Sequence, residues 1–163
     1  MSLAANQSAD SILKQLRNPF KMGLYFFLKL PSCWFWGIKV QTIDMDKAVI
    51  RIPFSWRTQN PFQSIYFAAQ LGAAELSTGL LCLTALAGKP KISMLITGVK
   101  ADFTKKAKAA TYFTCDQGAQ LEALLQKVAA GEETGQIELV SVGRMADGTK
   151  VCEAVFSWSF KKK

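Results

Sequence analysis

A long apolar stretch with one charge in it constrains this chain most. Between Arg57 and Lys89 the only charged residue is Glu75. The middle of this stretch is apolar nearly all round a helix, which is typical of a helix buried on every side. A carboxylate on a buried helix is costly unless it is paired or hydrogen-bonded. Glu75 therefore either has a structural partner, such as a lysine, a tyrosine or a backbone donor, or it takes part in chemistry.

The composition narrows the available chemistry. The chain has 163 residues, enough for one domain with a core, and it has no histidine. Serine and cysteine nucleophile systems that rely on histidine are excluded, as are metal sites built on histidine. A general base that works near neutral pH must be a carboxylate, a lysine, a tyrosine or a thiolate. We expect no metal site, and we interpret the four widely spaced cysteines as reduced core thiols of a cytoplasmic protein: Cys33, Cys82, Cys115 and Cys152.

The excess of positive charge bears on the partners. A net charge of +8 favours anionic partners such as nucleotides, phosphates or anionic lipid, but a solvated basic surface without a partner fits it equally well. The lysines do not alternate with aromatic residues in a nucleic-acid-binding motif, so we expect no nucleic-acid partner. No signal-peptide pattern opens the chain, which favours the cytoplasm.

An apolar segment near the N-terminus allows two interpretations. Residues 22–38 are interrupted by Lys29 and Pro31, and the pieces between are too short to cross a bilayer. Apolar residues recur every four positions from Ile12 to Leu28, which predicts helices packed across the domain. The run 24–28 is also apolar enough to form a hydrophobic lid or to touch a membrane surface. We favour the packed helices and expect no membrane contact.

The order of hydrophobic patterns predicts an α+β fold. Two short helices are followed by a hairpin, a long helix, and four more strands with a short helix inserted among them. Asn60 and Pro61 suit the start of the long helix, and Gly88 suits its end. The simplest architecture is one antiparallel sheet wrapped around a central helix, with residues 1–32 as a helical extension and 33–163 as the domain proper. The expected helices are 11–17, 19–30, 61–87 and 119–130, and the expected strands are 34–43, 47–56, 91–103, 109–115, 136–145 and 150–160.

Small residues accompany Glu75 on its helix face. Positions three and four residues away share this face, and they include Gly72 and Gly79. Small residues let a ligand or another backbone approach closely. A carboxylate above a narrow apolar slot suits a general base, because desolvation raises its pKa. A buried glutamate with a purely structural partner explains the same pattern.

The chain resembles the hot-dog fold in its element order and in the run before its long helix, Asn60-Pro61-Phe62-Gln63-Ser64. It is similar to acyl-CoA thioesterases of the phenylacetate-pathway and 4-hydroxybenzoyl type, and most of all to the domain of unknown function DUF4442, over roughly residues 33 to 160. Members have an asparagine before the helix, an acid within it, and often a serine or threonine near the start of the next strand. Here Asn60, Glu75 and Ser93 match these positions.

The resemblance implies roles for these residues. Glu75 would activate water or attack a thioester carbonyl, Asn60 would position the water or the substrate, and Ser93 would assist from the facing strand. The backbone N–H groups of Gln63 and Ser64 would form an oxyanion hole at the helix N-terminus. Many members have His-Gly-Gly at this turn, where this chain has Gln63-Ser64-Ile65.

The resemblance also implies a substrate and an assembly. Members pair as dimers or as dimers of dimers through the strand after the helix, and CoA enters as part of the substrate, with no other cofactor. The implied function is hydrolysis of an acyl-CoA or acyl-carrier thioester. Two alternatives stay open: binding of a fatty-acyl or lipid-like ligand without turnover, and a purely structural dimer. Basic residues that would hold the CoA phosphates at the pocket rim are Lys89, Lys91, Lys105 and Lys106.

Overall fold

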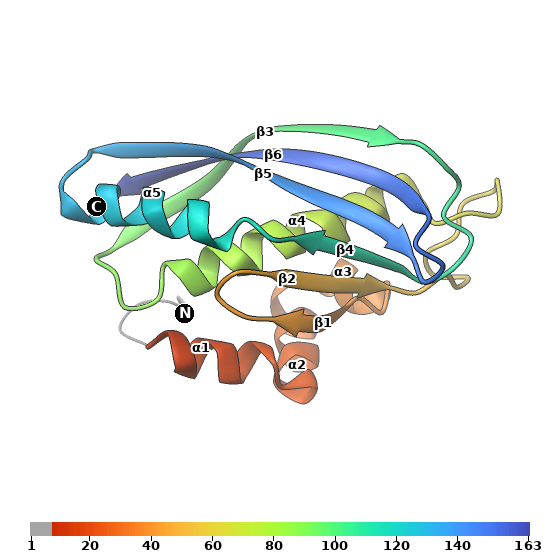
Figure 1. Cartoon of the computed structure of the whole chain (residues 1–163). Coiled ribbons are helices and arrows are strands. Elements are labelled where there is room, and N and C mark those ends of the chain that lie inside the picture. The colour runs from red at the N-terminus through yellow and green to blue at the C-terminus, as the bar shows by residue number, and fades with distance from the viewer. Residues whose placement is uncertain (1–7) are drawn as a thin grey trace.

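A curved six-stranded sheet wraps around a long helix, and three short helices precede it (Figure 1). The computed structural model describes residues 8–163. All neighbouring strands are antiparallel, in the order β1-β2-β4-β5-β6-β3. The predicted α+β architecture is therefore confirmed. The elements are α1 (Ala9–Leu16), α2 (Pro19–Lys29), α3 (Pro31–Phe35), β1 (Lys39–Ile43), β2 (Ala48–Ile52), α4 (Phe67–Ala85), β3 (Ile92–Phe103), β4 (Thr111–Cys115), α5 (Gly118–Ala130), β5 (Thr134–Met145) and β6 (Lys150–Lys162).

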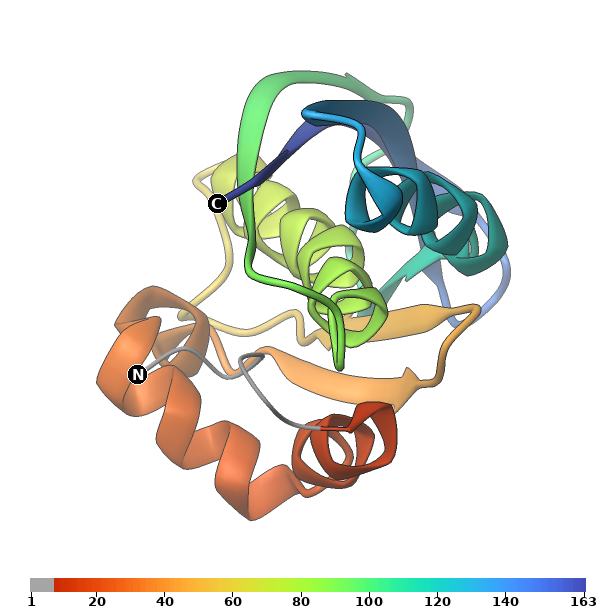
Figure 2. The same ribbon diagram turned by 90° about the vertical axis from the view of Figure 1, so that its left-hand side faces the viewer.

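Helix α4 lies in the concave face of the sheet, as Figure 2 shows. Thirteen of its 19 residues are buried, which explains why its sequence is apolar nearly all round. Two polar contacts join the helix to the sheet. The hydroxyl oxygens of Ser77 and Ser141 lie 2.7 Å apart, and the Trp158 indole donates a hydrogen bond of 3.1 Å to the Thr78 hydroxyl. These contacts fix how α4 is turned, and so fix which residues it presents to solvent.

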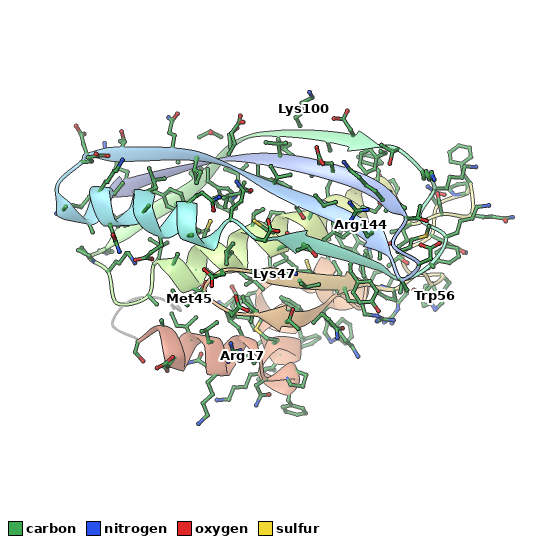
Figure 3. The ribbon with its side chains drawn as sticks, in the orientation of Figure 1. Arg17, Met45, Lys47, Trp56, Lys100 and Arg144 are labelled. Atoms are coloured by element: carbon green, nitrogen blue, oxygen red, sulfur yellow. The ribbon has the colours of Figure 1, made fainter. Side chains whose placement is uncertain are left out.

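The N-terminal helices pack at the β1 edge of the sheet (Figure 2). Helix α2 begins as predicted, because the Asn18 side chain accepts hydrogen bonds from the backbone of its first turn and Pro19 occupies its first position. Arg17 (Figure 3) ties the end of α1 to β1 through a 2.8 Å hydrogen bond from Nε to the Ile43 carbonyl. Buried residues of α1 and α2 belong to the same core as α4. Within residues 8–163 no helix combines the length and the hydrophobicity needed to cross a membrane.

Three predicted boundaries are wrong by four residues or more. The second strand ends at Ile52 instead of at Trp56. The first strand starts at Lys39, five residues late, because the residues after Pro31 form the short helix α3. The long helix starts at Phe67 instead of Pro61. The Asn60 side chain does cap backbone N–H groups, but those of a tight turn over residues 60–64. The chain then stays extended up to the helix, held by a hydrogen bond of 2.8 Å from Ile65 N to the Ala107 carbonyl.

Candidate functional site

Glu75 lies in the middle of α4, on the stripe of that helix that is least covered by the sheet. The side chain is partly buried, and burial raises the pKa of its carboxyl group. Among the described residues, no hydrogen-bond donor and no cation contacts the carboxylate. The structural partner that would explain a buried acid is therefore missing within this part of the chain.

Small and aromatic side chains surround this carboxylate. A methyl group added at Gly79 would come within 2.9 Å of Glu75 Oε1, so the acid folds down over its own helix. A methyl group at Gly72 would likewise meet the ring of Trp36 at 2.9 Å. Both glycines do allow a close approach, but by the side chains of Trp36 and Glu75 and not by the ligand or backbone that was predicted.

The charge of Glu75 reaches two neighbouring groups from the N-terminal helices. Burial, and secondarily the negative charge of Glu75, raises the pKa of the Tyr25 hydroxyl. The same two causes raise the pKa of the Cys33 thiol to about 11. Both groups stay protonated near neutral pH. Helices α2 and α3 thus supply one wall of the Glu75 site, with neutral side chains that leave the acid uncompensated.

A second candidate site lies at the N-terminal end of α4. It is a cavity of about 330 Å³. Lys105 and Lys106, which were predicted to bind phosphate, line it from the loop after β3. Its aromatic lining residues come from α4 and from the end of β3. The lining residues are Asn60, Ser64, Ile65, Phe67, Gln70, Phe103, Thr104, Lys105 and Lys106.

The predicted oxyanion donors are already in use. The Gln63 N–H donates to the Asn60 backbone carbonyl at 3.1 Å, and the Ser64 N–H donates to Asn60 Oδ1 at 3.2 Å. An N–H group so engaged is poorly placed to bind an oxyanion. The N–H groups that open α4, at Phe67 and the two residues after it, have no intrahelical acceptor, as in any helix. They are the donors that this end of the helix offers.

Gln70 was not predicted, and its environment is unusual. The side chain is only 4% exposed, and its Nε2 donates to the Ile65 carbonyl at 3.0 Å. Its Oε1 is buried and is without a hydrogen-bond partner. An unpaired buried acceptor is costly and rare. A lone amide side chain within an apolar helix was the sequence signal that pointed to it.

The two parts of the site are separated along the helix. Eight residue steps lie between Phe67 and Glu75, and a helix rises by 1.5 Å per residue, so the separation is about 12 Å. A single thioester carbonyl cannot contact the first N–H groups of α4 and the Glu75 carboxylate of the same chain. A second copy of the chain is needed if both are to act on one carbonyl.

Three other predicted residues lie elsewhere. Ser93 pairs with Lys161 in the sheet and donates to its carbonyl, so its side chain lies on the face opposite α4. The Lys89 ammonium group bonds to Glu122 at 2.7 Å and to the Ala85 carbonyl at 2.8 Å, which closes the C-terminal end of α4. Lys91 is exposed at that same end. The structure does not bring these residues to the carboxylate or to the cavity.

The four cysteines are buried free thiols, as predicted. Within residues 8–163, no group of three or more acidic, cysteine or histidine side chains is arranged to bind a metal ion. The groups present at the two parts of the site are a carboxylate, backbone N–H groups, amides, hydroxyl groups and lysines.

Sequence comparison identifies the family. The model of the domain of unknown function DUF4442 matches residues 21–159. The chain belongs to the DUF4442 family. No curated protein matches the sequence.

Solved structures match the DUF4442 chain over nearly its whole length. A protein of unknown function from Pseudomonas aeruginosa, described as a probable thioesterase, has 16% identity and a TM-score of 0.75, with 91% of this chain and 99% of the other covered. A protein of unknown function from Chlorobaculum tepidum has 14% identity and a TM-score of 0.76, with 98% and 99% covered. A thioesterase from Haemophilus influenzae has 13% identity and a TM-score of 0.64, with 85% and 88% covered. At these identities the matches establish the fold, which is the hot-dog fold.

Proposed function

We propose that this DUF4442 protein hydrolyses a thioester of a small-molecule carrier, an acyl-CoA or an acyl-carrier thioester, with Glu75 as the base or the nucleophile. The observation that carries the proposal is the environment of Glu75. Its carboxyl group has a raised pKa and no partner among the described residues, so it is free to take up a proton. A carboxylate with a raised pKa is a better base near neutral pH than an ordinary one.

Two variant structures of one structural relative support the choice of residues. A Staphylococcus aureus protein that shares the fold, at 14% identity and a TM-score of 0.61, has been crystallised with alanine in place of a glutamate and, separately, in place of a glutamine. One of these structures is described as that of a thioesterase. The glutamine precedes the glutamate by the same number of residues as Asn60 precedes Glu75. We therefore assign Asn60 to positioning the substrate, since within residues 8–163 its side chain uses only Oδ1 in hydrogen bonds.

The proposed enzyme acts as a homodimer. Strand β3 is the last strand of the sheet, has 12 residues, and leaves one edge unpaired. Leu95 and Val99 on this strand are 66% and 55% exposed, as expected for an edge that pairs with another strand. Antiparallel pairing of two β3 strands sets the two α4 helices against each other in opposite directions. The Glu75 of one protomer then faces the start of α4 in its partner. A carboxylate from one chain and the first N–H groups of α4 from the other chain can therefore act on the same carbonyl group.

The proposed reaction conserves atoms and charge. The ionised Glu75 takes a proton from water while the water oxygen attacks the carbonyl carbon. The oxyanion that forms accepts hydrogen bonds from the first N–H groups of α4. The carbon–sulfur bond then breaks, and the thiolate takes the proton from Glu75. The products are a carboxylic acid and a free thiol. Lys105 and Lys106, at the edge of the cavity, are assigned to the carrier phosphate.

Thiol release from a panel of acyl-CoAs tests the proposal. Glu75→Gln keeps the shape of the side chain and should lower kcat by about 100-fold or more. Ser93→Ala is the matched control, because the Ser93 hydroxyl lies on the far face of the sheet, and it should keep full activity. Failure of the unmodified protein to release thiol from any chain length, or equal rates for the glutamine variant, would show that Glu75 is not a catalyst.

A second candidate function is binding of a lipid-like ligand without turnover. An apolar cavity of about 270 Å³ between α2 and β1 favours it. Its lining includes Met22, Phe26 and Val40, with Lys39 as its charged member. Native mass spectrometry of freshly purified protein would detect a copurified lipid. Fast turnover together with a ligand-free spectrum would exclude this alternative.

A further inference from the structure

Helix α2 presents an apolar face to solvent. Phe20 is 86% exposed, Leu24 is 55%, Phe27 is 53% and Leu28 is 62%. These four residues recur at the spacing that places side chains on one face of a helix. The ring of Trp34, from α3, packs edge-on against Phe27 at 5.1 Å and is 48% exposed itself. We refer to these five residues as the α2 patch.

The core does not need these side chains. Helix α2 already contributes Met22 and Phe26 to the core from its opposite face, at 5% and 2% exposure. Isolated exposed apolar residues are ordinary, but a contiguous patch of large aromatic and aliphatic side chains marks an interaction surface. Its partner therefore has to offer apolar area.

The charges around the α2 patch indicate what else the partner offers. From Ser11 to Ile43 the chain has five cationic residues and no acidic one. Lys21 in the first turn of α2 and Lys29 at its last residue are both exposed. Arg17 is engaged with β1 (Figure 3), but its guanidinium group still adds to the local positive potential. An apolar patch with cations nearby fits a partner that has an apolar interior and a negatively charged surface.

We propose that the α2 patch docks on an anionic lipid bilayer, with α2 lying in the plane of the interface. In this arrangement the aromatic and leucine side chains enter the acyl boundary to about 5–10 Å, and the flanking lysines contact the headgroups. This is attachment to a surface and not a crossing, which agrees with the absence of a membrane-spanning helix among residues 8–163. The sequence-based expectation of no membrane contact is replaced by this proposal.

Charge argues against a second copy of the chain as the occupant. Two α2 patches placed face to face would bring the cations of both chains together, with no acidic residue of this segment to compensate. The free edge of β3 is the surface with a strand to pair, and it lies on a different element. The cavity between α2 and β1 is a further argument for lipid. Trp34 of the α2 patch lines this cavity together with Pro19 and Gly23, so an acyl chain can enter the cavity next to the patch.

Cosedimentation with vesicles tests the proposal on the full chain. One set of vesicles contains equal parts of phosphatidylcholine and phosphatidylglycerol, and the other contains phosphatidylcholine alone. The protein should bind the anionic vesicles, and high salt should weaken the binding. Phe20→Glu combined with Leu24→Glu should lower the affinity about tenfold or more. Phe62→Glu is the matched control, since Phe62 is 71% exposed but lies outside the α2 patch, and it should bind normally.

A charge series gives a second, independent arm. Lys21→Gln and Lys29→Gln should each lower affinity for the anionic vesicles about fivefold. Lys127→Gln, at an exposed lysine on α5, should have no effect. If the glutamate double variant fails to fold, this series still decides the question. Equal binding to both vesicle types, equal loss in the controls, or loss of dimer mass by light scattering in the α2 variants would overturn the proposal.

Discussion

Replacing Glu75 by glutamine should make the protein more stable at neutral pH, by an amount that depends on pH. The amide has nearly the same shape as the carboxylate but carries no charge. Burial raises the pKa of Glu75, and among residues 8–163 no donor offsets its loss of water. The native state therefore disfavours the ionised side chain, and Glu75→Gln removes that cost.

The sign of the pH dependence follows from linkage. The folded-state pKa of Glu75 lies above its value in the unfolded chain. Below the unfolded value both states are protonated, and the stabilising effect of the protonated acid is fully present. It is lost as the pH rises through the folded pKa, because the unfolded chain holds the charge more easily. A pKa difference of one between the two states is worth about 1.4 kcal/mol. For a chain of this length that corresponds to about 4 °C in Tm.

Urea unfolding at a fixed protomer concentration measures this effect. The chain has no histidine, so few groups ordinarily titrate in the middle of the range from about pH 4 to about pH 8. The gap in free energy of unfolding between Glu75→Gln and the unmodified protein should open as the pH rises. Glu132→Gln, at an exposed position, should show no such gap. A gap that is the same at every pH, or a less stable Glu75→Gln protein at neutral pH, would refute the reasoning.

Three further predictions concern glycines, strain and thiols. Gly118→Ala should destabilise the protein by about 2 kcal/mol or more, because the added methyl group would collide with the carbonyl oxygen of Met45, which is labelled in Figure 3. Gly23→Ala should stabilise it by about 0.5–1 kcal/mol through helix propensity, because no atom lies within 4 Å of the added methyl group. Thermal melts of the two variants test both predictions. Gln63→Gly should stabilise the protein by about 1 kcal/mol, because Gln63 has a left-handed φ of 57°, and a loss in urea unfolding would show that its side chain offsets the strain. The four cysteine thiols should react with a disulfide reagent about 100-fold more slowly in the native protein than in urea. Burial raises the pKa of three of these thiols to about 11 and also raises the pKa of the fourth, Cys82. Rapid labelling of the native protein would contradict this prediction.

Local chemistry made much of the fold predictable. Asn18 caps α2, Asp44 accepts the hydrogen bonds of the turn between β1 and β2, and Gly148 has a positive φ in the turn between β5 and β6. Each of these features rests on hydrogen bonds or backbone angles within a few residues. The start of α4 was not predictable in this way. Asn60 followed by proline has the same signature before a helix as before a tight turn. The backbone of residues 65 and 66 decides between the two, because Ile65 N donates to the Ala107 carbonyl and Tyr66 N donates to the Thr58 carbonyl. Neither acceptor is the residue four positions earlier that a helix would require.

The candidate site was predictable in part, for the same reason. Glu75 and its small neighbours could be read from one helix face, and Gly79 does lie against the carboxylate. Ser93 matched a family position by spacing alone, but the pairing register of β3 with β6 turns its side chain to the other face. A one-residue change of register reverses the face of every side chain in a strand, so spacing without register could not decide this.

The polar residues of α4 divide into two groups by their hydrogen bonds. Ser77, Thr78 and Thr84 each donate to the carbonyl three residues earlier, at 2.7 to 2.9 Å, so they cost the fold little. Gln70 Oε1 and the Glu75 carboxylate have no such partner in the described chain. Gln70 lines the cavity at the start of the helix, and Glu75 lies five residues, or about 7.5 Å, further along the helix axis. The hydroxyl groups of this helix are satisfied within the helix, whereas Gln70 Oε1 is buried without a partner and the partly buried Glu75 carboxylate has no protein donor among the described residues. Gln70 lies near the start of α4 and Glu75 lies near its middle. Pairing with a second protomer would bring the start of one α4 to the middle of the other, which is what we expect of a site shared between two chains.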